Sequence, residues 1–157
     1  MSIEYRLARR GDEDGIYFVE VSCFRVPWSF DAIEYDVGFN SDALYVVALD
    51  KGRVIGFTGM HVVIDEGHIM NMAVLDEYRK QGIGQKLLEA LFELAPEEIR
   101  SYTLEVRETN LAAMNLYKKL GFYGVGVRRA YYTNPVEDAL IMWRTPDADA
   151  AGSENTP

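Results

Sequence analysis

The alternation of apolar and polar positions predicts strands in the first half of the chain. Strand-like runs rich in β-branched and aromatic residues occupy positions 5–8, 44–49 and 54–63, and another run ends at Val74. Asp50-Lys51-Gly52-Arg53 is typical of a hairpin turn, and Asp65-Glu66-Gly67 is expected to turn the chain into the run that ends at Val74. The runs at 44–49 and 54–63 and the run that ends at Val74 are therefore expected to form three consecutive antiparallel strands.

Apolar residues at helical spacing predict two helices between the first strand and the second. One passes through Ile16, Val19 and Glu20 towards Phe24, with Gly11-Asp12 as its turn and cap. After the loop at positions 26–29, a shorter helix includes Ile33 and Tyr35, and either Ser29 or Asp31 is its cap.

The second half continues the alternation of strands and helices. Leu87, Leu88 and Leu91 follow Ile83 at helical spacing, and Pro96-Glu97-Glu98 ends that pattern. A strand is expected at 102–106, then a helix at 111–120 with Asn110 as cap and Gly121 as stop. Two final strands, 122–128 and 139–143, are expected to flank a loop that carries Tyr131, Tyr132, Asn134 and Pro135.

Composition favours one globular domain at residues 1–145. A chain of 157 residues that is 48% apolar suits a single core. Residues 146–157 are mainly small, polar or acidic, so we expect a disordered tail that cannot bury enough apolar surface to offset its ordering entropy.

The charge and cysteine content narrow the classes of partner. A net charge of −9 argues against nucleic acid as a ligand and is compatible with a cationic substrate such as an amine or a basic peptide end. The single cysteine, Cys23, fits a reducing compartment. The chain has no signal-like start and no apolar run near the roughly 20 residues of a membrane span, so we expect a cytoplasmic protein with no membrane partner. We also expect a monomer or weak dimer.

The stretch Arg79-x-x-Gly82-x-Gly84 is the strongest chemical signal in the chain. It follows a strand and opens a helix, so its glycines lie where backbone N–H groups have no partner within the helix. A diphosphate can approach a backbone without Cβ atoms, the helix dipole favours its charge, and Arg79 and Lys80 add positive charge. An ordinary strand-to-helix turn that uses glycine for geometry alone is the alternative.

Two other phosphate-binding loops do not fit these residues. A P-loop needs Gly-Lys-Ser/Thr, whereas Gly84 is followed by Gln85-Lys86-Leu87. A dinucleotide fingerprint needs a third glycine where this chain has Leu87.

The loop resembles the Q/R-x-x-G-x-G/A acetyl-CoA loop of the GNAT N-acetyltransferases. Leu104-Glu105-Val106-Arg107, the run from Asn110 to Phe122 and the segments 128–132 and 137–139 are similar to RimI-type protein N-terminal acetyltransferases, as is Pro27-Trp28-Ser29. The resemblance covers nearly the whole chain short of the tail. It implies an α+β fold, an α/β/α sandwich with a mixed, mostly antiparallel sheet of about seven strands and about four helices.

The same resemblance implies the site residues and the acetyl-CoA cosubstrate. Residues implied to bind acetyl-CoA are Met72, Ala73, Val74, Arg79, Lys80, Gln81, Gly82, Ile83, Gly84, Gln85, Asn110 and Tyr117. Met72, Ala73 and Val74 are implied to act through their backbone, and Asn110 is implied to be both a helix cap and a cofactor contact.

Chemistry assigns two further roles. An amine attacks a thioester only when it is unprotonated, so a base is needed, and Glu105 alternates with Leu104 and Val106 so as to face away from the core. The alternative is a carboxylate on the wet side of a strand or paired with Arg107. Tyr117 is the candidate acid, which either protonates the departing sulfur or holds it by a hydrogen bond, and the alternative is a core aromatic residue.

The expected acceptor is a protein N-terminus. An α-amine has a pKa near about 7.7–8.0 and a lysine about 10.4, so lysine would need roughly 3 kcal/mol more help, and a carboxylate with a modestly raised pKa suffices for the α-amine. RimI-type enzymes act on the N-terminal alanine of a small-subunit ribosomal protein. Expected peptide contacts are Trp28, Tyr131, Tyr132, Glu137 and Asp138, although Glu137 and Asp138 could merely flank a strand.

Three alternatives keep other functions open. The chain could acetylate a lysine side chain or a small-molecule amine, or it could be a non-catalytic acyl-CoA-binding module. The histidines, His61 and His68, lie in predicted strands without a cysteine or acidic cluster at ligand spacing, so no metal is expected.

Overall fold

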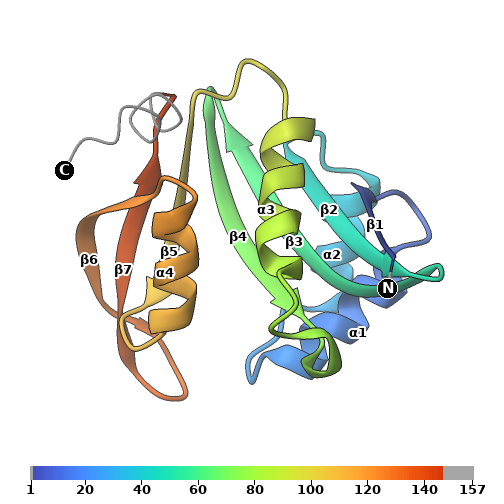
Figure 1. Cartoon of the computed structure of the whole chain (residues 1–157), viewed down its shortest axis with the longest axis horizontal. Helices are drawn as coiled ribbons and strands as arrows, with labels where there is room; N and C mark the ends of the chain where they lie inside the picture. The colour runs from blue at the N-terminus through green and yellow to red at the C-terminus, as the bar shows by residue number, and fades with distance from the viewer. Residues whose placement is uncertain (1, 147–157) are drawn as a thin grey trace. The chain divides into compact units, whose positions relative to one another are not determined.

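A computed structural model describes residues 2–146 and contains seven strands and four α-helices within that range (Figure 1). The strands are β1 (Ile3–Leu7), β2 (Ala43–Asp50), β3 (Arg53–Val63), β4 (Glu66–Val74), β5 (Ser101–Arg107), β6 (Tyr123–Tyr132) and β7 (Glu137–Arg144). The helices are α1 (Glu13–Cys23), α2 (Phe30–Gly38), α3 (Ile83–Leu94) and α4 (Leu111–Lys119), with a 3-10 turn η1 (Asp76–Tyr78) before α3. The predicted order of elements is confirmed; the 3-10 turn was not predicted.

The strands form a mixed sheet in the order β1-β2-β3-β4-β5-β7-β6. Neighbours β1–β2, β2–β3, β5–β7 and β6–β7 are antiparallel, whereas β4 and β5 are parallel. The fold is therefore the expected α+β architecture with a mixed, mostly antiparallel sheet.

The chain forms two compact units that share β4. Among the described residues, the first unit comprises residues 2–62 and Ile69–Pro96, and the second comprises Val63–His68 and residues 97–146. The expectation that residues 1–145 act as one domain stays a prediction, and the tail from 147 onward lies outside the described residues.

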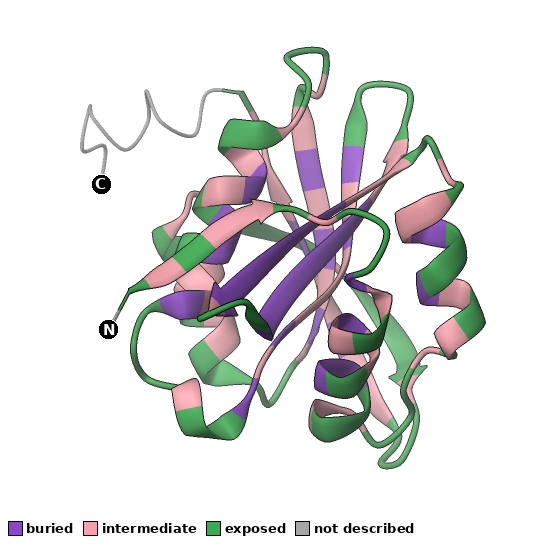
Figure 2. Cartoon of the chain, turned by 90° about the vertical axis from the view of Figure 1, so that its right-hand side faces the viewer, coloured by how far each residue is buried: buried purple, intermediate pink, exposed green. Residues whose placement is uncertain are grey.

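The core of the first unit lies along β2 and β3, whose central residues are buried (Figure 2). Helix α3 covers one face of these strands, and α1 and α2 cover the other (Figure 1). The buried face of α3 consists of Ile83, Leu87, Leu88 and Leu91, the residues that the helical spacing predicted. This packing fixes where α3 begins relative to the end of β4.

Local turn and cap chemistry explains most element boundaries in the first unit. Lys51 and Gly52 have φ values of 50° and 82°, which the tight β2–β3 turn requires. The Ser29 hydroxyl accepts a hydrogen bond from Ala32 N at 3.1 Å, so Ser29 is the cap of α2. The turn before β4 lies at Ile64 and Asp65, because Glu66 and Gly67 already belong to the strand.

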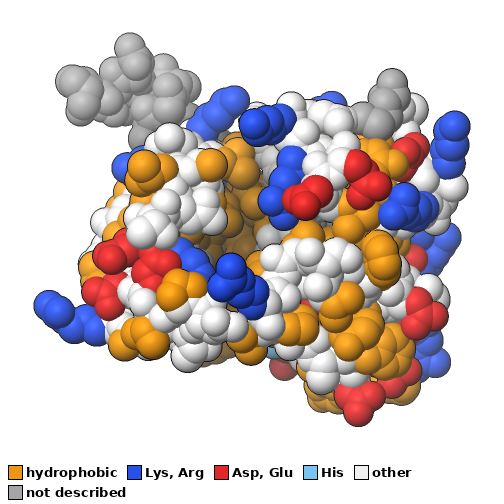
Figure 3. Space-filling model, turned by 90° about the horizontal axis from the view of Figure 1, so that it is seen from below, with side chains coloured by type: hydrophobic (Ala, Val, Ile, Leu, Met, Phe, Trp, Pro, Cys, Tyr) orange, Lys and Arg blue, Asp and Glu red, His pale blue; other side chains and the backbone are white. Residues whose placement is uncertain are grey.

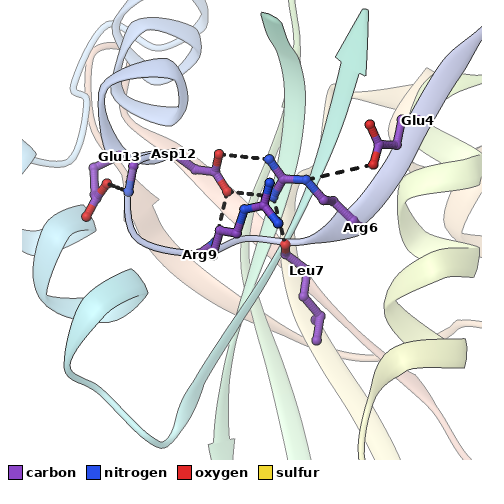
Figure 4. Close-up of polar contacts among 7 residues, drawn as sticks. Glu4, Arg6, Leu7, Arg9, Asp12 and Glu13 are labelled. Carbon is purple, nitrogen blue, oxygen red and sulfur yellow. Dashed lines mark hydrogen bonds and ion pairs between the residues drawn. The ribbon is translucent and has the colours of Figure 1, made fainter. Parts of the chain in front are cut away.

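The predicted cap position of α1 at Asp12 is confirmed, although its side chain does not make the cap hydrogen bond. Asp12 occupies the cap position, but its carboxylate makes no cap hydrogen bond and accepts instead from Arg9 N at 2.8 Å (Figure 4). Arg6 holds the same carboxylate with two guanidinium contacts of 2.8 and 3.1 Å. The bidentate contact with Arg6 and the bond from Arg9 N therefore direct the Asp12 carboxylate towards β1.

The second unit is organised by β5, whose residues alternate strictly. Tyr102, Leu104 and Val106 are buried, whereas Thr103 and Glu105 lie on the opposite face. Helix α4 begins where the Asn110 side chain accepts a hydrogen bond from Ala113 N at 3.1 Å, and the chain leaves it at Gly121 with φ 96°. Arg144 Nε of β7 donates to Leu120 O at 2.8 Å and fixes the C-terminal end of this helix.

The β6–β7 hairpin is longer than the sequence predicted. Tyr131 and Tyr132 lie in β6 rather than in a loop, and Glu137 and Asp138 lie in β7. The register shifts between Arg128 and Tyr132, where Ala130 has φ 51°, and Tyr132 then pairs with Glu137. A bulge of this kind lets the aromatic run stay in the strand while it changes direction.

Charges of both signs share the surface. On the face drawn in Figure 3, Lys and Arg side chains are interspersed with Asp and Glu side chains. Among the helices of residues 2–146, none has the length and apolar character needed to cross a membrane.

The contact between Arg6 and Asp12 should contribute measurably to stability. Arg6→Met leaves a carboxylate that is 10% exposed without its charged partner, so the free energy of unfolding should fall by about 1 to 3 kcal/mol in urea denaturation. The pKa of Asp12 is lowered, because the hydrogen bonds from Arg6 and Arg9 outweigh the opposing effect of burial. The stabilisation is thus present above the unfolded pKa of about 3.9 and lost as the pH falls through the folded value.

The matched control is Glu4→Gln, which removes a 3.9 Å contact between Arg6 and an exposed carboxylate. It should change stability by less than about 0.5 kcal/mol. Equal effects of the two variants, or a loss in Arg6→Met that persists unchanged once Asp12 is protonated in acid, would contradict the assignment.

Candidate active site

The start of α3 leaves backbone N–H groups without partners in the helix, an arrangement that suits an anion. Its cap residue, Gly82, is left-handed with φ 78° and ψ 11°, no side chain caps the helix, and no acidic residue lies in its first turn. The first hydrogen bond into the helix runs from Lys86 N to Gly82 O, so the N–H groups of Ile83, Gly84 and Gln85 have no partner within it. A Cβ built on Gly82 meets nothing within 4 Å, so the backbone can be approached closely there.

Arg79 is partly engaged by its own loop. Its Nε donates to Val74 O at 3.1 Å and its Nη1 lies 3.0 Å from Asp76, while the side chain remains 53% exposed. The Cys23 thiol also donates to Val74 O, at 3.5 Å. Arg79 therefore braces the end of β4 and still offers charge to solvent.

A buried carboxylate in the first unit holds the loop that carries Trp28. Glu20 on α1 is 1% exposed and accepts hydrogen bonds from Trp28 N at 2.8 Å and from Asn71 Nδ2 of β4 at 2.9 Å. Burial raises the pKa of Glu20, and these two bonds offset only part of that rise. The network ties the α1–α2 loop to the strand that leads to the glycine loop.

A second polar cluster lies beside Trp28. Asp36 is buried and accepts hydrogen bonds from Tyr45 Oη at 2.8 Å and Asn40 Nδ2 at 3.0 Å, and His61 Nε2 lies 2.7 Å from it. The His61 ring is 6.1 Å from the Trp28 ring, centroid to centroid. Trp28 is thus held by Glu20 through its backbone N–H, and its half-buried indole lies beside His61.

Glu105 is a largely buried carboxylate of the second unit. Its side chain is 6% exposed, and His68 Nε2 lies 2.9 and 3.2 Å from its two oxygens. Arg128 Nε lies 3.9 Å from one of them. The predicted orientation away from Leu104 and Val106 is confirmed, and the partner is His68 rather than Arg107.

The expected modest rise in the pKa of the base does not occur at Glu105. Burial alone would raise the pKa of Glu105, but His68, the Tyr131 hydroxyl and the charge of Arg128 together lower it below its ordinary value. The carboxylate is consequently ionised at neutral pH and is a weaker proton acceptor than an isolated buried glutamate.

Tyr117 lies on α4 with its ring 5.8 Å from the Phe122 ring, and burial raises its pKa to about 12. Its hydroxyl therefore keeps its proton at neutral pH. A thiol has a reference pKa of about 8.5, so full proton transfer to a thiolate would cost roughly 5 kcal/mol. Of the two expected roles, the pKa favours a hydrogen bond to sulfur over its protonation.

The β6–β7 hairpin is fastened by Arg107. Its guanidinium donates to Thr133 O at 2.9 Å, to Pro135 O at 3.1 Å and to Glu137 at 3.1 Å, and it stacks 4.4 Å over the Tyr132 ring. The other oxygen of Glu137 accepts from Thr109 N and Thr109 Oγ1, and Asp138 accepts from Ala130 N. Both acids are occupied by the chain itself, which favours a role in shaping the hairpin.

Several of these residues had a weak signal in the sequence or none. Glu20 shares a helical face with Ile16 and Val19, so an acid among buried positions was visible. His68 and Glu105 meet because the parallel register pairs His68 with Thr103, and no sequence pattern specifies that register. Within residues 2–146, no group of three His, Cys, Asp or Glu side chains could hold a metal ion.

Comparison with known proteins defines the class of this fold and site. The family model described as the acetyltransferase (GNAT) family matches residues 14–122. The chain belongs to this family.

Within the family, the chain is similar to enzymes named for one ribosomal protein. It is 37% identical over 134 residues to the ribosomal protein bS18-alanine N-acetyltransferase of Escherichia coli (strain K12), covering 83% of this chain and 89% of the relative. A Bacillus subtilis (strain 168) relative, named provisionally for the same activity, is 40% identical over 141 residues, covering 89% and 93%. The crystal structure of the ribosomal-protein-S18-alanine N-acetyltransferase from Escherichia coli superposes with a TM-score of 0.82 at 31% identity, covering 92% and 94%.

Removing the carboxylate of Glu20 should destabilise the first unit. Glu20→Ala leaves the donors Trp28 N and Asn71 Nδ2 without their acceptor, so the free energy of unfolding should fall by about 2 to 4 kcal/mol. Glu20→Gln should cost less than half of that, because the amide still accepts one bond and Asn71 can turn its own oxygen towards it.

Urea denaturation measures both variants, with Glu34→Ala on the exposed face of α2 as control. The control should stay within about 0.5 kcal/mol of the wild type. A Glu20→Ala protein as stable as that control would show that the buried network contributes nothing.

Proposed function

We propose that this protein is an acetyl-CoA-dependent N-acetyltransferase that acetylates the N-terminal α-amine of a protein. The observation that carries the proposal is the start of α3, where three backbone N–H groups have no partner within the helix. A Cβ at the cap residue Gly82 would meet nothing within 4 Å, and no acidic side chain lies in the first turn. Such a position suits the diphosphate of CoA, because the helix dipole and the free donors both favour an anion. Lys80, Gln81 and the exposed part of Arg79 complete the loop.

The proposed protein substrate is the N-terminal alanine of a ribosomal protein of the bS18 type. The relatives that cover most of this chain are named for that reaction. An α-amine also needs less help than a lysine to reach its unprotonated form at neutral pH, by about 2.5 pKa units.

The proposed peptide contacts are Trp28, Tyr131 and Tyr132. Trp28 is held by Glu20 through its backbone and lies beside His61 with its ring. Tyr131 and Tyr132 pack edge to face on β6, with centroids 5.0 Å apart. Rigid aromatic side chains of this kind give contact area at a low cost in conformational entropy.

The cosubstrate supplies the acetyl group as an activated thioester. In the proposed reaction Glu105 provides the negative charge that draws the proton from the attacking amine, and Tyr117 donates a hydrogen bond to the departing sulfur. The backbone of Met72, Ala73 and Val74 and the side chain of Asn110 are proposed to position the cosubstrate. Polarising donors at a reacting carbonyl are worth a few kcal/mol on the transition state.

The direct test is acetylation of a synthetic peptide that begins with alanine. Incubation with acetyl-CoA should add one acetyl mass, and blocking the α-amine of the same peptide should abolish the gain. Transfer to an internal lysine or to a free amine alone would favour the alternative substrates. Binding of CoA without transfer to any amine would leave only a binding module.

The two proposed catalytic side chains should affect turnover more than binding. Glu105→Gln should lower kcat by roughly 100-fold or more, and Tyr117→Phe by roughly 10-fold to 100-fold, because general acid–base groups typically contribute at this scale. Isothermal titration should give acetyl-CoA affinities within about threefold of the wild type. Full activity in both variants would refute these roles.

Gly82 should be required for acetyl-CoA binding. Gly82→Ala places a methyl group in the space open to the diphosphate, so the dissociation constant for acetyl-CoA should rise by roughly 10-fold or more. The methyl group also strains a backbone at φ 78°, at a cost of about 1 to 2 kcal/mol in stability.

Gly52→Ala is the matched control for the strain. Gly52 has φ 82° in the β2–β3 turn, and its Cβ would likewise meet nothing within 4 Å. Both variants should lose similar stability in urea, whereas only Gly82→Ala should bind acetyl-CoA less tightly. Equal affinities in the two variants would exclude the α3 loop as the diphosphate site.

A further inference from the structure

His68 and Glu105 form a carboxylate–imidazole pair that lies entirely within the second unit. His68 Nε2 faces both carboxylate oxygens at 2.9 and 3.2 Å. The carboxylate is 6% exposed and the imidazole 33% exposed. The imidazole is therefore the end of the pair that solvent reaches.

The other charged and titratable groups around the pair come from β4, β5 and β6. Arg128 and Tyr131 of β6 act on Glu105 directly, and the charge of Glu105 also raises the pKa of Tyr132. Arg107 lies two residues along β5 but is bound to Glu137 and the hairpin carbonyls. Glu66 lies two residues before His68 on β4.

These contacts leave Glu105 poorly suited to hold a proton. Its oxygens already face an imidazole, a guanidinium and a phenol, and the lowered pKa of Glu105 reflects this. The Nε2 position of the imidazole faces the carboxylate, so Nδ1 is the ring nitrogen at which His68 can gain a proton.

We propose that the proton lost by the attacking amine comes to rest on His68, with Glu105 as the carboxylate that orients the imidazole and stabilises its charged form. This deepens the proposed function and rests on it. His68 acts through water, as its partial exposure allows, and the pair then resembles other carboxylate–histidine arrangements in which the acid fixes the tautomer and never takes the proton.

The proton balance of the step is complete. As the amine nitrogen bonds to the acetyl carbon, its proton passes through water to Nδ1 of His68, while the Nε2 proton stays with Glu105. The carbon–sulfur bond breaks with its electron pair on sulfur, and the thiolate is held by the Tyr117 hydroxyl until it takes a proton from solvent. His68 then returns its proton to solvent.

The electrostatic coupling within the pair can be measured without any enzyme assay. The chain has two histidines, and an NMR pH titration of their ring protons, assigned with a His61→Gln variant, follows both. Glu105→Gln should displace the ring signals of His68, because it removes the carboxylate that Nε2 faces at 2.9 Å. The ring signals of His61, which contacts Asp36, should stay in place.

The rate profile tests the proton transfer itself. At saturating peptide and acetyl-CoA, kcat of the wild type should fall on the acidic side, because a protonated imidazole cannot accept the proton. His68→Gln keeps an N–H towards Glu105 but cannot titrate, so it should lower kcat at pH 7.5 by roughly 100-fold and leave only the acidic limb of the substrate amine itself. A merely structural role would lower the rate by the same factor at every pH and leave the shape of the profile unchanged.

The outcomes separate this inference from the proposed function. A protein that acetylates no amine overturns the proposed function and this inference with it. An active protein whose His68→Gln variant keeps both its rate and the shape of its pH profile overturns the inference alone. His68 ring signals that do not respond to Glu105→Gln also overturn it, whatever the activity.

Discussion

The pleat of β5 is the constraint on which the second unit depends. Leu104 and Val106 anchor the strand in the core, and the same alternation holds Glu105 on the opposite face. Once that register is fixed by the pairing of Glu105 with Ile141 of β7, the carboxylate has little freedom. Burial of a charge is costly unless the charge is paired. His68 and Arg128 lie beside the Glu105 carboxylate and provide that pairing.

The two units use different means to position their functional groups. In the first unit, the start of α3 offers backbone N–H groups, and Glu20 binds the backbone amide of Trp28 as well as the side chain of Asn71. In the second unit, side chains predominate, with Glu105, His68 and Arg107 each bound to further side chains or carbonyls. Backbone donors suit a diphosphate, whereas side chains supply groups that can change protonation state.

Features that depend on the local spacing of residues could be predicted from the sequence, whereas contacts that depend on the register between strands could not. The glycine loop, the buried face of α3, the Asn110 cap and the orientation of Glu105 follow from short patterns, and the structure has all four. The His68 partner depends on how β4 and β5 align, which no short pattern encodes. The sequence predicted a loop at Tyr131 and Tyr132, because the bulge at Ala130 interrupts the strand pattern before β6 continues.

The attachment of the α1–α2 loop has a consequence for how this scaffold can change its preferences. Glu20 accepts a hydrogen bond from the backbone N–H of residue 28, and this contact does not involve the indole side chain. Any non-proline residue could therefore stand at that position with the anchor intact. The side chain at position 28 can therefore be exchanged, by evolution or by design, while the hydrogen bond from its backbone to Glu20 continues to hold the loop.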